Sequence, residues 1–205
     1  MDVLEIYKQF GALLKGHFLL SSGNHSDTYL QSARVLEHPE IAQKLLVELK
    51  NLISSHEIIP QTICSPAIGG LLAGYELARS FGVRFIFTER VNGVMSLRRG
   101  FEVSPNEKVL ICEDIITTGG SAEEAAFCIK QKGGEVIAFA GLANRGFCNA
   151  ILPNGAKSSA RSAKCKLAND VPLFALCDVV FDMFSPDSCP LCENSEAIKP
   201  GSRGN

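Results

Sequence analysis

Between residues 61 and 145 of this 205-residue chain, short apolar segments alternate with segments of helical periodicity. The apolar segments are QTICS, RFIFTE, KVLICED and EVIAFAGLANR, and the helical segments are LLAGYELARSFG and SAEEAAFCIKQKGG. Apolar strands that alternate with helices of this length form parallel βαβ units, in which helices cover a buried sheet. The pattern therefore predicts an α/β fold with a central, mostly parallel sheet flanked by helices, and the length fits a single domain.

The segments that flank this repeat have weaker patterns. Apolar residues from Val3 to Leu14 recur at helical spacing and predict an N-terminal helix. FLLSSGNHSDTYLQS has a polar turn at its centre and predicts a hairpin. A second helix is expected from His38 and Pro39, because proline suits a first helical turn. VPLFALCDVVFDMF predicts a last strand and its exit, and a poorly periodic tail covers residues 185–205.

Acidic and basic residues nearly balance, with 22 Asp and Glu against 20 Lys and Arg. This balance gives no support for nucleic acid or a membrane surface as the main partner. The N-terminus lacks the layout of a signal peptide, so we expect a cytoplasmic protein. Four of the eight cysteines lie in apolar patterns and are expected to be buried thiols: Cys64, Cys112, Cys128 and Cys177.

Two acidic residues, Glu113 and Asp114, stand side by side where an apolar strand meets a glycine turn, in VLICEDIITTGGSAEE. Ligands of open α/β sheets bind at the carboxyl ends of such strands. The TTGGS turn then leads into a helix N-terminus, where backbone N–H groups, hydroxyls and the helix dipole favour a phosphate. Ser121 is expected to cap this helix, with Glu124 completing a capping box.

This short element matches the shape of a sugar phosphate. Its carboxylates accept hydrogen bonds from vicinal hydroxyls, and charge-assisted hydrogen bonds are strong. The simpler alternative is an ordinary helix cap with two surface acids. The apolar strand that leads directly into Glu113 and Asp114 favours the sugar-phosphate site.

VLICEDIITTGGS resembles the ribose-5-phosphate-binding signature of type I phosphoribosyltransferases. GHFLLSSGNHSDTYLQS is similar to the N-terminal hood segment of the orotate phosphoribosyltransferases, and CSPAIGG to their pyrophosphate loop. GLANRGF places an arginine where that family keeps a base-contacting one, and CPLC followed by KPGSR resembles a bacterial subgroup. The resemblance implies the type I phosphoribosyltransferase fold in one domain, residues 1–205, with a small hood formed mainly by residues 1–36.

The family implies a reaction. Orotate and 5-phosphoribosyl 1-diphosphate (PRPP) give orotidine 5′-monophosphate and diphosphate, with Mg²⁺, in pyrimidine (UMP) biosynthesis. The family also implies a homodimer. Orotate is already an anion, so no protein nucleophile is required, and no Ser-His-Asp or Cys-His pattern is evident.

The resemblance also assigns positions in this sequence. PRPP contacts are implied for Ser65, Ala67, Ile68, Gly69, Gly70, Glu113, Asp114, Ile115, Ile116, Thr117, Thr118, Gly119, Gly120 and Ser121. Orotate contacts are implied for Thr117, Arg145, Ser26, Tyr29 and Leu30. Mg²⁺ is held through the substrate diphosphate, and Asp114 is its candidate protein ligand through a water molecule.

The chain departs from better-known members of the family in its charges. Residues 90–100, RVNGVMSLRRG, are expected to form a polar, mobile loop that closes over the site. Many members carry lysine and histidine there, whereas this chain has arginines, which are its candidate catalytic residues: Arg90, Arg98 and Arg99. The alternative for these arginines is a solvated surface role. A hood lysine of many members aligns with Ser21, and a diphosphate-loop lysine aligns with Gly69.

Other residues that bind metals in proteins are scattered along the chain. His17 and His25 are expected to be structural or solvated. CPLC supplies Cys189 and Cys192, and a structural turn specific to the subgroup is favoured for this segment. The alternative is half of a zinc site, since thiolates suit zinc. Candidates to complete it are Cys148, Cys165 or a second copy of the chain. Because the sequence has no second CxxC, we expect clearly less than one zinc ion per chain.

Two other functions are compatible with the same fold. In a purine or xanthine phosphoribosyltransferase the base would differ, but the hood segment and Arg145 favour orotate, whose carboxylate calls for a cation. A regulator that senses PRPP and binds nucleic acid would need a DNA-binding module or a basic face. The only basic cluster, from Lys157 to Lys166, is short and is expected to be a flap or linker.

Overall fold

The computed structural model describes residues 2–20 and 23–200. The chain divides into two compact units. The central unit is His38–Val179, and the terminal unit combines the segments Met1–Glu37 and Val180–Asn205. The aligned hood position Ser21 and the end of the KPGSR motif lie outside the described residues.

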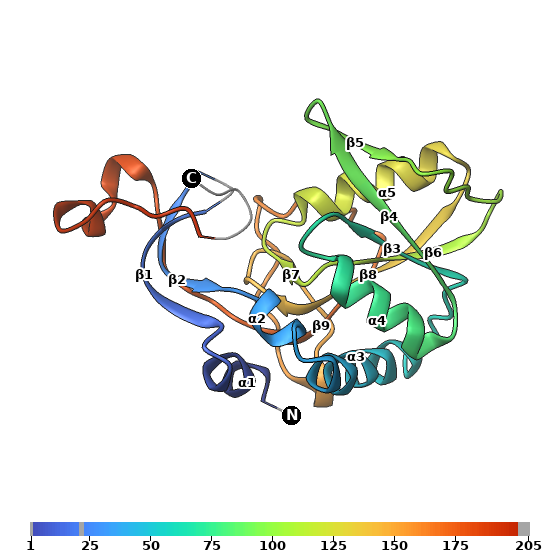
Figure 1. Cartoon of the computed structure of the whole chain (residues 1–205), viewed down its shortest axis with the longest axis horizontal. Coiled ribbons are helices and arrows are strands. Elements are labelled where there is room, and N and C mark those ends of the chain that lie inside the picture. The colour runs from blue at the N-terminus through green and yellow to red at the C-terminus, as the bar shows by residue number, and fades with distance from the viewer. Residues whose placement is uncertain (1, 21–22, 201–205) are drawn as a thin grey trace. The chain divides into compact units, whose positions relative to one another are not determined.

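The central unit contains a seven-stranded sheet in the order β5-β4-β3-β6-β8-β7, with β9 paired to β8 (Figure 1). The strands are β3 (Thr62–Pro66), β4 (Arg84–Val91), β5 (Val94–Leu97), β6 (Lys108–Cys112), β7 (Ile115–Ile116), β8 (Glu135–Asn144) and β9 (Leu173–Asp178). The pairs are parallel except for β4 with β5. The predicted α/β fold with a mostly parallel sheet is therefore confirmed.

Helices flank this sheet on both faces. They are α3 (Pro39–Ser54), α4 (Leu71–Phe81) and α5 (Gly120–Gln131), and Figure 1 shows α3 and α4 on one face and α5 on the other. Three buried alanines of α5, Ala122, Ala125 and Ala126, belong to the same core cluster as Ile111 and Phe139 of the sheet. Small side chains let the helix backbone approach the strands closely, so the start of α5 lies near the strand ends.

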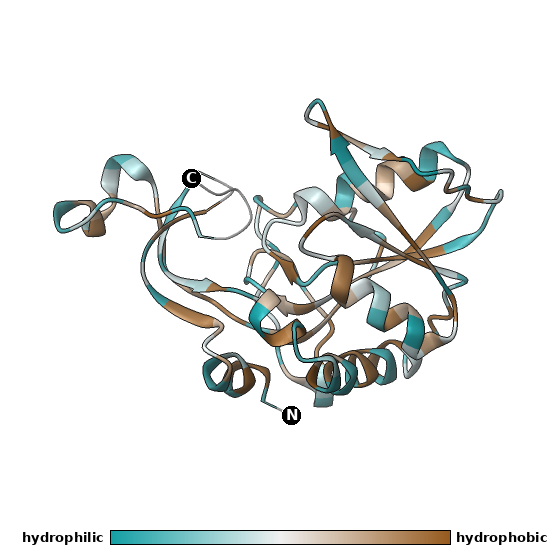
Figure 2. Cartoon of the chain, in the orientation of Figure 1, coloured by the Kyte–Doolittle hydropathy of each residue, from teal (hydrophilic) through white to brown (hydrophobic). Residues whose placement is uncertain are grey.

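The second helix begins where the sequence predicts. Pro39 occupies the first turn of α3, after His38 at the N-cap. Its buried stripe comprises Ala42, Leu45, Leu46, Leu49 and Ile53. Figure 2 shows hydrophobic colouring along the central strands and alternating hydrophobic and hydrophilic stretches along α3, as expected for a helix with one buried face.

The terminal unit contains the expected hairpin but a shorter first helix than expected. Helix α1 (Val3–Gln9) ends before Gly11, whose positive φ of 60° leads the chain out of the helix, and Leu14 lies in β1 (Leu13–Leu19). Strand β2 (His25–Leu30) pairs antiparallel with β1, and β10 (Met183–Phe184) pairs with β2. This unit also contains the short helical segments α2 (Ala33–Leu36), η2 (Pro186–Ser188) and η3 (Pro190–Glu193), and the central unit contains η1 (Pro153–Gly155).

The segment expected to be a polar loop, residues 90–100, is largely a β-hairpin. Asn92 and Gly93 connect β4 to β5 with positive φ angles of 51° and 83°. Asn-Gly favours the two-residue turns that match strand twist, so the sequence does carry a local signal for this hairpin. The hairpin packs on α5, where the Cys128 thiol lies 3.2 Å from the Met95 carbonyl oxygen and Arg90 pairs with Glu124 at 2.6 Å.

Gly74 of α4 is the point at which the helix approaches the sheet most tightly. A Cβ atom there would lie 1.9 Å from Ser65 Oγ and 2.8 Å from Phe85 Cε2. Gly74→Ala should therefore lower the free energy of unfolding by about 1–3 kcal/mol, despite the better helix propensity of alanine. Urea denaturation measures the change. Gln43→Ala, on the exposed side of α3, is the control and should change stability by less than about 0.5 kcal/mol. Equal stability of Gly74→Ala and the parent chain would contradict the tight packing.

Candidate active site

The acidic pair is held in place by the backbone of β8. Cys112 pairs with Ala140 and Ile115 with Ala143, so β6 and β7 run along the same edge of β8 in one register. Between them, the Glu113 N–H donates to the Ala140 carbonyl at 2.9 Å, and the Leu142 N–H donates to the Asp114 carbonyl at 2.9 Å. The sequence placed the pair at a strand end, whereas the strand resumes directly after it. The backbone of both acidic residues is thus fixed by main-chain hydrogen bonds rather than being part of a loose turn.

The loop expected to bind diphosphate lies against this pair. A Cβ atom on Gly70 would lie 2.8 Å from Glu113 Oε2 and 2.9 Å from the Cys112 carbonyl oxygen. A Cβ atom on Gly69 would lie 3.2 Å from Asp114 Oδ1. Cβ atoms in proteins essentially never lie as close to other heavy atoms as the two distances at Gly70, so Gly70 tolerates no larger residue. Glycine is therefore required at Gly70, whereas a side chain at Gly69 would need the Asp114 carboxylate to shift by a few tenths of an ångström.

Charge repulsion and burial shape the electrostatics of the pair. Burial, and then the negative charge of Asp114, raises the pKa of Glu113 well above its ordinary value. Burial also raises the pKa of the Cys112 thiol, with smaller contributions from the charges of Glu113 and Asp114. A site with two crowded carboxylates favours ligands that bring hydrogen-bond donors or a cation.

The phosphate turn leads into α5 through glycine. Gly119 is the N-cap, with a left-handed φ of 77°, and no side chain caps the helix. The expected capping box of Ser121 and Glu124 is therefore wrong, because Ser121 already lies inside the first turn and Glu124 pairs with Arg90. Without a side-chain cap, the first N–H groups of α5 remain available to an anion.

A basic segment covers this turn, and we call residues 157–168 the basic flap. The Lys166 N–H donates to the Thr118 carbonyl at 2.7 Å, and the Ala168 N–H donates to Glu123 Oε2 at 3.0 Å. A Cβ atom on Gly119 would lie only 2.5 Å from the Leu167 side chain, so Leu167 occupies the space beside this glycine. Lys166 Nζ lies 3.8 Å from the corresponding position on Gly120, so an ammonium group stands beside the helix N-terminus. The sequence showed the basic cluster but not which turn it covers.

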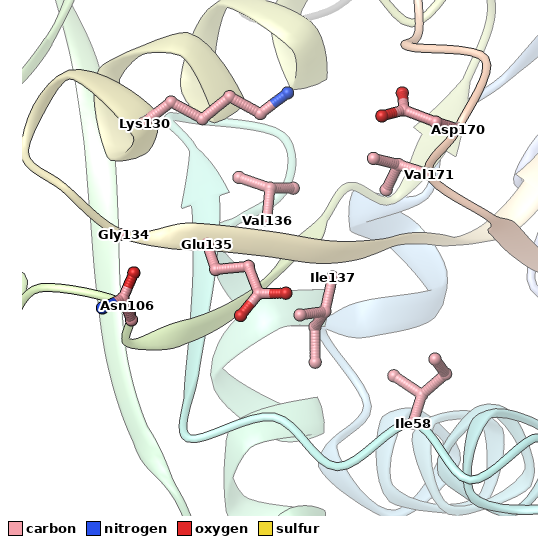
Figure 3. Close-up of a pocket in the computed structure, with 9 residues that line it drawn as sticks. All are labelled: Ile58, Asn106, Lys130, Gly134, Glu135, Val136, Ile137, Asp170 and Val171. Carbon is pink, nitrogen blue, oxygen red and sulfur yellow. The ribbon is translucent and has the colours of Figure 1, made fainter.

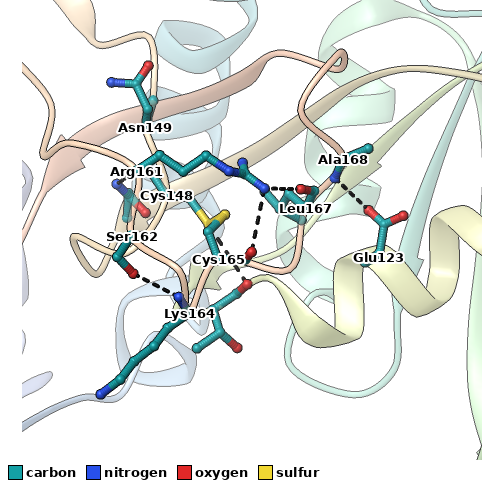
Figure 4. The surroundings of a disulfide bond; sticks show 12 residues. Glu123, Cys148, Asn149, Arg161, Ser162, Lys164, Cys165, Leu167 and Ala168 are labelled. Carbon is teal, nitrogen blue, oxygen red and sulfur yellow. Dashed lines mark hydrogen bonds between the residues drawn. A yellow bond between two sulfur atoms is a disulfide. The ribbon is translucent and has the colours of Figure 1, made fainter.

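A disulfide bond joins Cys148 to Cys165 and anchors the basic flap (Figure 4). Arg161 adds a hydrogen bond from its guanidinium to the Leu167 carbonyl. Closing a loop of this length restricts the unfolded chain and typically stabilises a protein by about 3 kcal/mol. Neither cysteine is available to complete a zinc site with CPLC, which corrects one expectation from the sequence.

The ends of β7, β8 and β9 are tied together beside Arg145. The Arg145 N–H donates to the Ile116 carbonyl at 2.8 Å, and its side chain is 5% exposed. Asn144 Nδ2 donates to Asp178 Oδ1 at 2.8 Å and to the Cys148 carbonyl at 2.7 Å. Arg145 therefore follows the end of β8 beside the end of β7, the short strand that comes directly after the acidic pair, and the emergence of its side chain at the acidic pair stays a prediction.

Other residues implied for PRPP face the protein interior. Ser65 is fully buried in β3, and its hydroxyl donates to the Cys112 carbonyl at 2.6 Å. Ile116 is buried in the core under α5. Ile68, in contrast, is 72% exposed. Any contact that Ser65 and Ile116 make with a ligand must come from the backbone.

The candidate catalytic arginines are engaged in ion pairs around the β4–β5 hairpin. Arg99 lies 3.0 Å from Glu89, and Arg98 lies 4.0 Å from the same carboxylate. The Arg99 guanidinium also lies over the Phe87 ring, 5.5 Å from its centre. In this arrangement the described ion-pair partners of these arginines are acids of the hairpin and of α5, not the acidic pair.

The hood residues implied for orotate lie on β2 in the terminal unit. The Ser26 hydroxyl donates to the Asp182 carbonyl at 2.8 Å. The Tyr29 ring lies 5.8 Å from the Phe18 ring, and Leu30 is buried. These contacts set the conformation of the strand within its own unit.

A separate pocket of about 640 Å³ lies at the start of β8 (Figure 3). Asn106, Lys130, Glu135 and Asp170 are among its lining residues. It lies at the opposite end of β8 from Arg145, so it is distinct from the site that the acidic pair forms.

Comparison with known proteins identifies the family. The family model of the phosphoribosyl transferase domain matches residues 31–150. An orotate phosphoribosyltransferase of Campylobacter curvus is 61% identical over 207 residues, and one of Helicobacter acinonychis is 60% identical over 205 residues, with full coverage of both chains in each case. The chain belongs to the orotate phosphoribosyltransferases. It is therefore a transferase of the pyrimidine pathway.

Solved structures of this family share the fold at low sequence identity. The orotate phosphoribosyltransferase of Aeropyrum pernix aligns with a TM-score of 0.65 and 21% identity, over 86% of this chain and 93% of its own. That of Mycobacterium tuberculosis in complex with inorganic phosphate gives 0.60 and 18%, over 86% and 95%. Within residues 2–20 and 23–200, no helix has the length and apolar character needed to cross a membrane.

The raised pKa of Glu113 predicts that ionisation of this side chain lowers the free energy of unfolding. Because the folded state binds this proton more tightly than the unfolded state, ionisation destabilises the fold as pH rises above the ordinary value of 4.5. Glu113→Gln should therefore raise the free energy of unfolding at pH 7.5, by about 1.4 kcal/mol for each unit of pKa elevation, and change it little below pH 4.5.

Urea denaturation at both pH values measures this difference. Glu135→Gln, at the exposed start of β8, makes the same carboxylate-to-amide change away from the acidic pair and is the matched control. A Glu113→Gln variant that is less stable than the parent chain at pH 7.5 would contradict the assignment.

Proposed function

We propose that this chain transfers the 5-phosphoribosyl group from PRPP to orotate and releases diphosphate. The observation that carries the proposal is the contact between the acidic pair and the Gly69–Gly70 backbone, next to the uncapped start of α5. These three features match the three polar parts of PRPP. The carboxylates match the ribose hydroxyls, the glycine loop matches the diphosphate, and the helix N-terminus matches the 5-phosphate. The names of relatives at about 60% identity support orotate as the acceptor.

In this proposal the donor binds through main chain and carboxylates. Glu113 and Asp114 accept hydrogen bonds from the ribose hydroxyls, while the N–H groups from Thr117 to Ser121 bind the 5-phosphate. Lys166 of the basic flap stands beside this turn and adds positive charge. The backbone from Ala67 to Gly70 contacts the diphosphate, and Ser65 fixes that loop through its bond to the Cys112 carbonyl.

Mg²⁺ fits this donor set, because carboxylate and phosphate oxygens are its preferred ligands. Asp114, whose carboxylate lies against Gly69, is the residue best placed to hold the ion through water. When bound, Mg²⁺ neutralises part of the charge on the diphosphate. Orotate contacts are proposed for Arg145 and Thr117, together with Ser26, Tyr29 and Leu30 of β2.

The reaction forms a bond from a ring nitrogen of orotate to the anomeric carbon and breaks the bond from that carbon to diphosphate oxygen. Negative charge develops on the leaving diphosphate, and cationic side chains stabilise it. Arg98 and Arg99 are proposed for this role, with Arg90 as the third candidate. They must first leave Glu89 and Glu124, so closing of the hairpin includes an exchange of ion pairs.

We also propose that the chain acts as a homodimer. Leu72 and Tyr75, on one side of α4, are 52% and 62% exposed, and Ile68 just before the helix is 72% exposed. Exposed apolar residues that cluster on one face of a helix are typical of a protein interface. A second copy of this chain is the partner that the family resemblance implies.

Two variants test the assignment of the two substrates. Arg145→Ala should lower kcat/KM for orotate by about 1.5–3.5 decades, because losing one partner of a buried charge pair costs about 2–5 kcal/mol. Asp114→Asn should lower kcat/KM for PRPP by about one to two decades, because hydrogen bonds to charged groups contribute about 1.5–3 kcal/mol. Steady-state kinetics with each substrate varied in turn measures both effects.

Each variant serves as the control for the other. Equal losses for both substrates in Arg145→Ala would place this arginine in the fold or in the PRPP site. Turnover of adenine, guanine or xanthine in place of orotate by the parent chain would overturn the choice of base. Absence of turnover with every base would remove the enzymatic proposal itself.

A further inference from the structure

Two histidines and two cysteines from opposite ends of the sequence meet in the terminal unit. The ligand atoms of His17, His25, Cys189 and Cys192 all lie within 4.8 Å of one another. His17 lies in β1 and His25 begins β2, whereas the cysteines belong to the CPLC segment, 172 residues after His17. Four such ligands in one place supply the partner pair that a single CxxC lacks.

The distances between the ligand atoms fit a tetrahedral ion. His17 Nε2 lies 3.6 Å from Cys189 Sγ and 3.8 Å from Cys192 Sγ, and His25 Nδ1 lies 3.3 Å from Cys192 Sγ. Zn–S bonds of about 2.3 Å and Zn–N bonds of about 2.0–2.1 Å place the corners of a tetrahedron about 3.3–3.8 Å apart. The two ring nitrogens are 2.8 Å apart, so the rings must separate by about 0.5 Å around an ion.

A hydrogen bond on the far side of the His17 ring selects its tautomer. His17 Nδ1 lies 2.9 Å from the Ser195 carbonyl oxygen, which only accepts hydrogen bonds. Nδ1 therefore carries the proton, and Nε2 presents its lone pair to the cluster. Metal-binding histidines commonly donate their other ring N–H in this way.

The backbone holds the CPLC segment on the histidine hairpin from both sides. Before it, Phe184 of β10 pairs with His25. After it, the Ile198 N–H donates to the His17 carbonyl and the Leu19 N–H donates to the Ile198 carbonyl, both at 2.8 Å. His17, His25 and Cys189 are buried and Cys192 is exposed, so an ion can enter from the Cys192 side.

We propose that His17, His25, Cys189 and Cys192 form a structural zinc site. Protein atoms fill all four positions, so no open position remains for a water or substrate, as in structural rather than catalytic zinc sites. Both cysteines bind as thiolates and release their protons to solvent when Zn²⁺ binds. The expectation of clearly less than one zinc ion per chain rested on a missing partner pair, and the two histidines provide it.

The site links the C-terminal tail to the hood hairpin. β2 begins at His25 and also carries Ser26, Tyr29 and Leu30, so the ion fixes the strand on which the proposed orotate contacts lie. The zinc site itself does not depend on the proposed reaction, because its ligands, geometry and test involve no substrate.

Metal content tests the site directly. The full chain, expressed with zinc in the medium and purified with a non-chelating phosphine reductant, should contain one zinc ion per chain by elemental analysis. Cys192→Ser changes the exposed ligand and should weaken zinc binding by at least about tenfold, since even changes outside the ligand shell cost 10–100-fold. Cys128→Ser removes a thiol outside the cluster and should retain full zinc.

Cobalt provides a second measurement on the same proteins. Co²⁺ in place of zinc should give the strong visible absorption of a tetrahedral thiolate site in the parent chain and in Cys128→Ser, and this absorption should be lost in Cys192→Ser. Circular dichroism checks that the variants fold. Less than about 0.1 zinc ion per chain in the parent protein would overturn the proposal. Equal zinc affinity of Cys192→Ser and Cys128→Ser, measured by competition with a chelator, would do so as well.

Discussion

The candidate active site depends on the hydrogen-bond ladder between β8 and the strand that carries Glu113 and Asp114. Two neighbouring carboxylates repel each other, and burial of one of them opposes its ionisation. The chain holds them in place because their backbone N–H and carbonyl groups pair with Ala140 and Leu142. Rigid main-chain bonds thus keep an electrostatically unfavourable arrangement that a ligand with hydroxyls or a cation relieves.

The other parts of the site follow from this ladder by close contact. Gly69 and Gly70 lie against the two carboxylates, and Gly119 begins α5 beneath the Leu167 side chain. Ser65 joins the glycine loop to the end of β6 through its bond to the Cys112 carbonyl. The disulfide between Cys148 and Cys165 then keeps the basic flap over the phosphate turn. The acidic pair lowers the free energy of unfolding, and the core and these cross-links raise it.

Much of the central unit could be predicted from the sequence, because hydrophobic periodicity reports directly which faces of strands and helices are buried. Strands β3, β4, β6, β8 and β9 and helices α3 to α5 follow that pattern, whereas β5 and β7 lie in segments that were predicted to be a loop and a turn. The acidic pair was recognised because it interrupts an apolar run. The hairpin at Asn92 and Gly93 also had a local signal, which the polar composition of the surrounding segment obscured.

Features that need distant residues could not be predicted. His17 and His25 were lone histidines until the tail brought Cys189 and Cys192 to them, because no local pattern records a contact across 172 residues. The position of Lys166 beside Gly120 and the pairing of Cys148 with Cys165 depend likewise on how an irregular segment folds back. Gly119 rather than Ser121 caps the helix: its φ is left-handed, and a Cβ atom there would lie 2.5 Å from the Leu167 side chain of a distant segment.

Hydrogen–deuterium exchange with PRPP and Mg²⁺, in the absence of orotate, tests the site most directly. Binding should slow amide exchange in residues 66–70 and 113–121 and in the basic flap around Lys166, because a bound ligand stabilises the segments that contact it. The segments around the pocket at the start of β8, residues 134–137, should exchange at unchanged rates. Protection confined to that pocket, with unchanged exchange at residues 113–121, would contradict the account.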